Sequence, residues 1–289
     1  MRFLICVYAM ILVAPVTIAC GPSENYQTEN QKKGIYKVVG EFSEPIGIII
    51  IDRNGVFDIS WAAGSAFLID ANKGIFGTAK HVVDLDTKYK IFFCGRVYKA
   101  ERILPPVISD VAFIQITGKF DSSSFPKPYP IATNVSLNDE VFVRGIHPHP
   151  PDMQNGVVVH SIIKSYYGLD NYRSEFVYDN LSARVTDLTE LISSDTFAER
   201  EHIGASIIFR YIKVSTHEEH KITGDSQGGF RGLSGGPTIN VQKQIVGING
   251  AQPDEEYYAL EENGLRYKPR VTLSLVPVAE LRRALRSLP

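Results

Sequence analysis

Cysteine is scarce in this chain of 289 residues, which contains three: Cys6, Cys20 and Cys94. Cys6 and Cys20 belong to an apolar amino-terminal region, so Cys94 alone remains for the folded body. No disulfide is therefore expected within that body. This excludes the secreted domains that depend on several disulfides, so the fold must rely on a hydrophobic core, for which the chain is long enough.

An excess of positive charge is also missing, because 30 Lys and Arg residues accompany 32 Asp and Glu residues and the formal net charge is −2. A nucleic-acid-binding protein would normally carry a basic stripe, so no nucleic-acid partner is expected. No run of like charge is long enough for a polybasic membrane patch. The sequence has no phosphate-binding loop of the GKS or GKT kind, and no cofactor is predicted.

Long apolar runs are confined to the amino terminus, where Phe3 to Val16 is almost wholly apolar and follows the basic Arg2. This run is too short for a stable membrane span and is typical of an export signal. The alternative is a buried first helix or strand. The very polar stretch from Gly21 to Lys33 comes directly afterwards and disfavours that alternative.

The segment Thr17–Cys20 resembles the lipobox of bacterial lipoproteins, in which cleavage before the cysteine precedes lipidation of its thiol. Thr17 departs from the pattern, since leucine is usual at that place. The resemblance implies a signal peptide at residues 1–19, a lipid anchor at Cys20, a polar tether at residues 20–34 and a folded domain at residues 35–289. The expected location is the bacterial cell envelope, in the periplasm or on the outer membrane, and plain secretion is the alternative.

Short apolar runs broken by Gly, Pro, Asn and Asp dominate the rest of the chain, and they predict an all-β sandwich or barrel. The expected strands are Ile46–Ile51, Gly64–Ile69, Ile75–Thr78, Val111–Ile116, Glu140–Gly145, Gly156–Ser161, Ser206–Val214 and Gln244–Ile248. Apolar residues at helical spacing predict helices at Asp187–Glu201 and Val278–Leu288. The second helix would follow Pro277, which is tolerated at a helix start.

The most specific motif is Gly232-Leu233-Ser234-Gly235-Gly236-Pro237. A nucleophilic serine needs backbone N–H donors aimed at the oxyanion that develops during attack. Gly232 can adopt the conformation that points its N–H inward beside that of Ser234, and the glycines after the serine let a substrate backbone approach closely. The alternative is a glycine-rich hairpin turn.

Two further motifs supply a histidine and an aspartate. His81 follows the second strand of an apolar hairpin, which is a rigid mount for a general base. Asp110 opens the apolar strand that ends at Ile116. Each residue taken alone also fits a structural role. Together with Ser234, however, they appear in the chain order His, Asp, Ser, which is the order of the chymotrypsin type.

Around these residues the sequence resembles the trypsin-like serine peptidases, and most of all the bacterial HtrA/DegP-type branch. The resemblance covers roughly Gly47 to Leu288 with one gap. The matching segments are Thr78–Val82, Asp110–Ala112, Arg231–Gly236, Asn240, Gly247–Asn249 and the closing Leu273–Pro277 with the helix after it.

The resemblance implies two six-stranded antiparallel β-barrels with a C-terminal helix and a catalytic site between them. Ser234 would attack a peptide carbonyl, His81 would accept its proton, and Asp110 would orient His81. The N–H groups of Gly232 and Ser234 would form the oxyanion hole. The implied partners are protein or peptide substrates.

Departures from the family also carry information. Leu233 stands where trypsin has an aspartate that pairs with a new amino terminus, so activation by N-terminal insertion is not expected. Pro237 matches trypsin better than the HtrA branch. No PDZ domain is expected after the C-terminal helix. The stretch from about Leu169 to Ile222 has no counterpart in the compact family core and is interpreted as a helical insertion, either a flap of strand, helix and strand over the site or a surface excursion.

The segment Gly224–Gly229 resembles the trypsin serine motif, with Ser226 in the place of the nucleophile. This assignment is rejected because Gln227 sits where close substrate approach favours glycine. By family spacing, the segment instead lines the primary specificity pocket, with Gly228 where trypsin carries its charge-selecting aspartate. An uncharged pocket base predicts small or aliphatic side chains at the cleaved bond. The other predicted pocket residues are Ile248, Asn249 and Gly250.

Two other functions remain open on the same fold. One is a catalytically silent pseudoprotease lipoprotein that binds peptides or proteins in the same site, and the other is a serine esterase. No metal site is predicted, because His217 and His220 lack the spacing of the metalloprotease motif and His147-Pro148-His149 is interpreted as a solvated loop.

Overall fold

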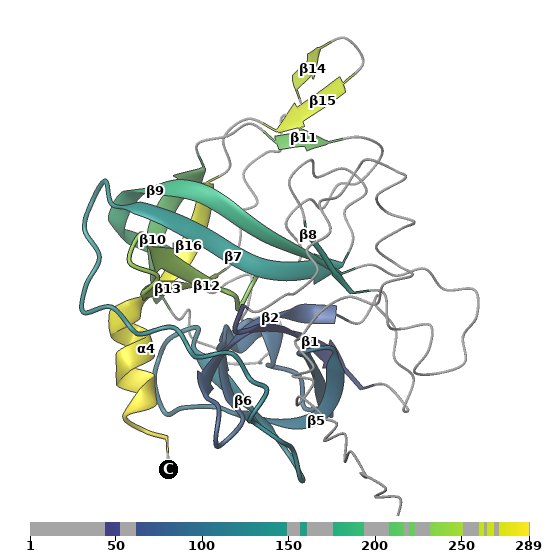
Figure 1. Cartoon of the computed structure of the whole chain (residues 1–289). Coiled ribbons are helices and arrows are strands. Elements are labelled where there is room, and N and C mark those ends of the chain that lie inside the picture. Colours follow the sequence, from purple (N-terminus) through teal and green to yellow (C-terminus); the bar gives the residue numbers. More distant parts are fainter. Residues whose placement is uncertain are drawn as a thin grey trace, which may run out of the picture.

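The computed structural model describes residues 44–52, 62–148, 157–160, 176–193, 208–216, 220–222, 232–250, 260–262, 265–268 and 272–288. The expected signal peptide, tether and lipidation site at Cys20 lie outside these residues. The described chain forms two closed six-stranded antiparallel β-barrels and a C-terminal helix, α4 (Figure 1). This confirms the all-β double barrel expected from the resemblance to the trypsin-like peptidases.

The first barrel closes in the order β1-β2-β3-β6-β5-β4. Its strands are β1 (Ile46–Ile51), β2 (Ala62–Asp70), β3 (Ile75–Thr78), β4 (Tyr89–Phe93), β5 (Arg96–Ile103) and β6 (Ala112–Ile116). Burial continues almost without interruption along β1, β4 and β6, so both faces of these strands are covered, and Phe67, Phe76 and Phe113 are fully buried. This core gives a rigid support to the segments that follow β3 and precede β6.

The second barrel is a ring of six strands in the order β10-β16-β13-β12-β7-β9, closed by pairing of β9 with β10. Its strands are β7 (Glu140–Pro148), β9 (Phe176–Ser193), β10 (Ile208–Thr216), β12 (Pro237–Asn240), β13 (Ile245–Asn249) and β16 (Thr272–Pro277). Strand β8 (Val157–His160) pairs antiparallel with the first residues of β9 and lies outside the ring of six strands. A separate small sheet of β11 (His220–Ile222), β14 (Leu260–Glu262) and β15 (Leu265–Lys268) projects from the top of Figure 1.

The region expected to be a helical insertion supplies two strands of the second barrel instead. Residues 187–193 belong to β9, so the predicted helix is wrong there, and residues 194–201 lie outside the described residues. Strand β9 pairs with β7 along one edge and with β10 along the other. Burial alternates at Leu181, Ala183 and Val185, which is the period of a strand. The non-local pairing with β10 satisfies the β9 backbone and overrides the helix-like spacing further along.

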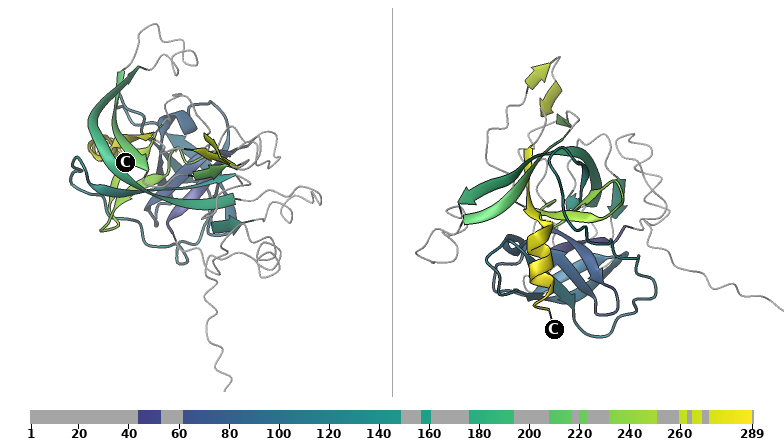
Figure 2. Two further views of the ribbon diagram at one scale, coloured as in Figure 1. Left: turned by 90° about the horizontal axis from the view of Figure 1, so that it is seen from above. Right: turned by 90° about the vertical axis from the view of Figure 1, so that its left-hand side faces the viewer.

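Helix α4 (Val278–Leu285) begins after Pro277, close to the predicted start. Its apolar face buries Val278, Leu281 and Ala284. The two views of Figure 2, together with Figure 1, show the helix leaving the second barrel and running beside the first. Among the described residues, no helix has the length and hydropathy needed to cross a membrane.

Cys94 lies in the turn between β4 and β5 with a positive φ of 48°. It is disulfide-bonded, and its partner cysteine lies outside the described residues. The sequence led us to expect no disulfide within the folded body, and this bond is not one of that kind, because Cys94 is the one cysteine of the body. A bond between Cys94 and an amino-terminal cysteine was not considered there, since those cysteines were assigned to the signal peptide and the lipid anchor.

The hydroxyl of Tyr89 is buried in the first barrel and donates a hydrogen bond of 2.7 Å to the carbonyl oxygen of Leu85. Burial raises the pKa of Tyr89 from its ordinary value of 10.0 to about 12, against the opposing effect of nearby Arg102. Between pH 10 and 12 the unfolded chain loses this proton while the folded chain keeps it. The contribution of neutral Tyr89 to the free energy of unfolding is therefore fully present below pH 10 and is lost as the pH rises from 10 to 12.

We expect this tyrosine to cost the protein about 2 kcal/mol of unfolding free energy between pH 10 and 12. Urea unfolding at pH 8, 10 and 11.5 measures the loss. The variant Tyr89→Phe should start about 1 kcal/mol lower at pH 8, because it lacks the hydrogen bond, and should decline less steeply above pH 10. Parallel declines in the two proteins would contradict the assignment of this effect to Tyr89.

Candidate active site

His81 lies in the short 3-10 helix η2 (Lys80–Val82), directly after β3. The backbone N–H of Lys80 donates to the carbonyl oxygen of Asp110 at 3.2 Å, which joins this turn to the segment before β6. Val82 and Val83 are buried beneath the turn, whereas the His81 side chain is 18% exposed. The histidine is therefore held on a buried support with its ring at the surface of the first barrel.

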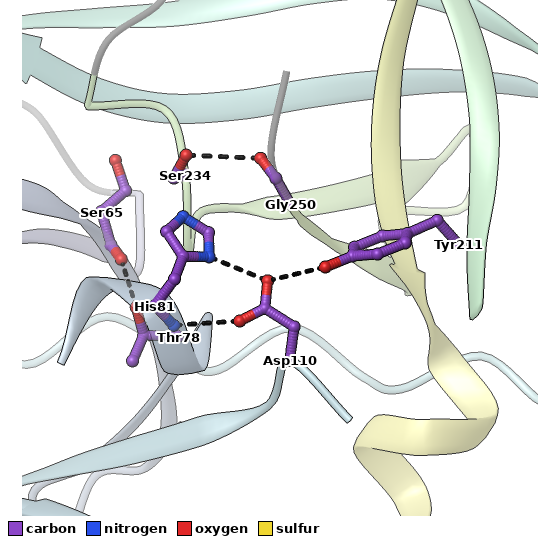
Figure 3. Close-up of polar contacts among 7 residues, drawn as sticks. All are labelled: Ser65, Thr78, His81, Asp110, Tyr211, Ser234 and Gly250. Carbon is purple, nitrogen blue, oxygen red and sulfur yellow. Dashed lines mark hydrogen bonds and ion pairs between the residues drawn. The ribbon is translucent and has the colours of Figure 1, made fainter. Parts of the chain in front are cut away.

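The carboxylate of Asp110 is buried and receives three hydrogen bonds (Figure 3). The backbone N–H of His81 donates to Oδ1 at 2.9 Å, and the His81 ring binds Oδ2 through Nδ1 at 2.8 Å. The hydroxyl of Tyr211, a residue of β10, also donates to Oδ2 at 3.2 Å. Because an ionised carboxylate only accepts hydrogen bonds, the proton of a neutral His81 resides on Nδ1 and leaves Nε2 as an acceptor.

Ser234 lies in the loop before β12, and Figure 3 shows the second ring nitrogen of His81 pointing toward it. The Ser234 hydroxyl donates to the carbonyl oxygen of Gly250 at 3.3 Å. The structure thus brings together His81 and Asp110 from the first barrel and Ser234 from the second. A hydroxyl, an imidazole and a buried carboxylate that follow one another in space in this order can activate an oxygen nucleophile.

The first barrel holds the Ser234 loop through backbone contacts of Ser65 in β2. The Ser65 N–H donates to the carbonyl oxygen of Ser234 at 2.7 Å, and the Ser65 carbonyl accepts a bond of 2.8 Å from the Thr78 hydroxyl. The Ser65 hydroxyl lies 2.7 Å from the carbonyl oxygen of Gly232 and accepts a bond from the Ile146 N–H at 2.9 Å. These bonds set the position of the serine relative to the histidine across the two barrels.

The loop that carries Ser234 depends on two glycines with positive φ, 101° at Gly232 and 84° at Gly235. L side chains rarely adopt such angles. Among the described residues, no protein group accepts a hydrogen bond from the N–H of Gly232 or of Ser234. An oxyanion hole needs N–H donors that are free to bind the developing oxyanion, and this role of Gly232 and Ser234 stays a prediction.

Leu233 anchors the same loop through packing rather than charge. Its side chain is 3% exposed and belongs to the core of the second barrel. Its carbonyl oxygen accepts a hydrogen bond of 3.0 Å from the side-chain amide of Asn249. A buried aliphatic side chain therefore holds this loop from the residue directly before Ser234.

The residues predicted to line a specificity pocket lie in different environments. Gly228 and the rejected nucleophile Ser226 lie outside the described residues. Ile248 is fully buried, and Asn249 is 4% exposed with its amide bonded to the carbonyl oxygens of Arg144 and Leu233. Gly250 is half-buried beside Ser234. In the described part of the chain, no group of three or more His, Cys, Asp or Glu side chains could hold a metal ion.

Sequence reasoning missed Tyr211 and the contacts of Ser65. The run from Ser206 to Val214 predicts a strand, but nothing in it indicates that Tyr211 reaches a residue of the other barrel. Ser65 stands in the strand before His81, and its bonds connect residues 81 and 167 positions away in the chain. Only the paired barrels bring these groups together.

Comparisons with known proteins support the fold and provide no sequence family. Neither a scan against models of protein families nor a search of curated proteins finds a match. Among solved structures, the chain is similar to the active form of the Rv3671c protease from M. tuberculosis, with 13% identity, a TM-score of 0.54 and coverage of 98% of this chain and 94% of that one. The inactive form gives 13% identity, a TM-score of 0.51 and coverage of 92% and 96%. At this identity the likeness shows the fold alone.

Gly235 and Gly118 have nearly equal φ angles but different surroundings. Alanine substitutions at the two positions therefore distinguish the cost of backbone strain from the cost of steric crowding. A Cβ at Gly235, with φ +84°, would lie 2.2 Å from the Thr78 hydroxyl oxygen and 2.3 Å from the Ser65 carbonyl oxygen. A Cβ at Gly118, with φ +85°, would meet nothing within 4 Å. We expect Gly118→Ala to cost about 1 kcal/mol of unfolding free energy and Gly235→Ala about 3 kcal/mol or more.

Urea unfolding of both variants beside the wild type measures these costs. Equal losses in the two variants would contradict the tight contact between the Ser234 loop and the first barrel.

Proposed function

We propose that this chain, built on the double-barrel fold that it shares with the Rv3671c protease, is a serine endopeptidase. The observation that supports this most directly is the constellation of Ser234, His81 and buried Asp110 at the junction of the barrels, with Nδ1 of His81 bonded to the carboxylate. The imidazole is thereby held in the tautomer that a general base for Ser234 requires.

In the proposed reaction, Ser234 Oγ attacks the carbonyl carbon of a peptide bond and its proton passes to Nε2 of His81. The N–H groups of Gly232 and Ser234 stabilise the negative oxygen that forms. His81 then delivers the proton to the leaving amine, the C–N bond breaks, and an acyl-enzyme remains on Ser234. Water activated by His81 hydrolyses this ester and restores the hydroxyl. The Asp110 carboxylate, bonded to Nδ1, stabilises the imidazolium form of His81.

The finer assignments rest on the sequence. The motifs around His81, Asp110 and Ser234 favour the HtrA/DegP-type branch. Gly228, Ile248, Asn249 and Gly250 are proposed to form an uncharged specificity pocket that accepts small or aliphatic side chains. Buried Leu233 supports activation without a new amino terminus, because no carboxylate stands there to receive one.

We place the protein in the bacterial cell envelope, as the apolar amino-terminal run and the lipobox-like Thr17–Cys20 suggest. The disulfide of Cys94 bears on this assignment, since only Cys6 and Cys20 remain as partners in the sequence. A thiol that carries a lipid cannot also form a disulfide. Non-reducing peptide mapping of the mature protein therefore separates a lipoprotein from a secreted form in which Cys20 is cross-linked.

Reaction with a fluorophosphonate probe tests the proposal without knowledge of the substrate. Residues 20–289 of the wild type should be labelled, and Ser234→Ala should lose all labelling, because the probe bonds only to an activated serine. Ser226→Ala is the matched control and should be labelled like the wild type. Loss of labelling in Ser226→Ala alone would overturn the assignment of the nucleophile. Turnover of protein substrates against simple esters then separates a peptidase from an esterase.

A catalytically silent binding protein is the second candidate, and one contact favours it. The Ser234 hydroxyl is bonded to the carbonyl oxygen of Gly250, so it must rotate before it can donate to His81. A folded wild type that is not labelled by the probe, yet binds peptides in a manner that Ser234→Ala preserves, would favour this candidate over the peptidase.

A further inference from the structure

Tyr211 lies beside both ends of the catalytic constellation, and we propose that it is a positioning residue for Asp110 and, through Asp110, for His81. The inference deepens the proposed function and rests on it. Nothing in the triad motifs points to this residue, because it belongs to β10, in the region first interpreted as an insertion.

The Tyr211 side chain is fully buried and connects the two barrels. Its backbone lies in β10, next to β9 and β16 of the second barrel, while its hydroxyl donates to Asp110 in the segment before β6 of the first. A tyrosine buries a large apolar ring and requires a partner for its hydroxyl. Here that partner is the carboxylate that orients His81.

The position of the hydrogen bond matters because Oδ2 of Asp110 is shared. This one oxygen accepts from Nδ1 of His81 at 2.8 Å and from the Tyr211 hydroxyl at 3.2 Å, while Oδ1 accepts from the His81 backbone. The tyrosine therefore opposes rotation of the carboxylate. Because its hydroxyl also donates to Oδ2, it weakens the hydrogen bond that this oxygen accepts from Nδ1 of His81. Hydrogen bonds to buried charged groups are among the stronger ones in proteins.

The aromatic ring also contacts the segment that holds the nucleophile. A Cβ at Gly250 would lie 2.7 Å from Cε1 of Tyr211, so the glycine leaves the space that the ring occupies. The carbonyl oxygen of the same Gly250 accepts the Ser234 hydroxyl. One side chain is thus bonded to the carboxylate of Asp110, as Figure 3 shows, and its ring also lies close to Gly250, the hydrogen-bond partner of Ser234.

The test compares Tyr211→Phe, which keeps the ring and removes the hydroxyl, with Tyr89→Phe. Tyr89 is a matched control because its hydroxyl is also buried and donates to a carbonyl oxygen at 2.7 Å. We expect the second-order rate constant for fluorophosphonate labelling to fall about tenfold in Tyr211→Phe, since one hydrogen bond to a charged group is removed. In Tyr89→Phe it should change less than about twofold.

Proton NMR of the His81 Nδ1–H provides a readout that does not depend on turnover. With its second donor removed, Oδ2 should accept more strongly from His81, and the resonance should move downfield in Tyr211→Phe and stay in place in Tyr89→Phe. Gly250→Ala, whose Cβ would push the ring away from Asp110, should move it in the same direction and provides a second, independent variant.

The outcomes separate this inference from the proposed function. Labelling of the wild type together with an unmoved resonance and an unchanged rate in folded Tyr211→Phe would overturn the role of Tyr211 and leave the peptidase proposal intact. An unlabelled wild type whose resonance still moves in Tyr211→Phe would contradict the peptidase proposal and keep the positioning role of Tyr211.

Discussion

The buried carboxylate of Asp110 is the group on which the rest of the site depends. An ionised carboxylate in an apolar interior is costly unless hydrogen-bond donors surround it, and here the donors come from His81 and from Tyr211. One partner belongs to the first barrel and the other to the second. The electrostatic requirement of a single side chain therefore links the packing of the two barrels to the orientation of the histidine.

Hydrophobic packing and backbone hydrogen bonds complete this link on the serine side. Leu233 extends into the core of the second barrel, while the carbonyl oxygen of the next residue, Ser234, is bonded to Ser65 of the first. The loop that carries Ser234 is packed tightly against the first barrel, because even a Cβ added at Gly235 would overlap Thr78 and Ser65. The loop is held by the apolar packing of Leu233 and by backbone hydrogen bonds rather than by an ion pair at Leu233.

Strands β4 and β5 of the first barrel were not predicted, whereas local sequence was sufficient to predict its strands β1, β2, β3 and β6, the C-terminal helix and the neighbourhood of His81, Asp110 and Ser234. These features depend on short-range patterns, namely an apolar run, a proline before a helix and a glycine-rich loop. The same reasoning failed at β9, where Leu188, Leu191 and Ile192 have helical spacing although the segment pairs with β10 as a strand. It also gave no indication of the contact between Tyr211 and Asp110, since that contact joins residues 101 positions apart. Long-range pairing decides both cases, and it leaves no local signature in the sequence.

The ring order of the second barrel has a consequence for synthesis of the protein. The strands of the first barrel end at Ile116, so that barrel has all its strands early, whereas the second closes only when β16 pairs with β10 and β13. Strand β16 begins at Thr272, well after Ser234 in the chain. A growing polypeptide can therefore carry His81 and Asp110 in a finished barrel while the barrel of Ser234 still has an open edge. His81, Asp110 and Ser234 can therefore come together in a closed structure only after β16 has been synthesised and has paired with β10 and β13.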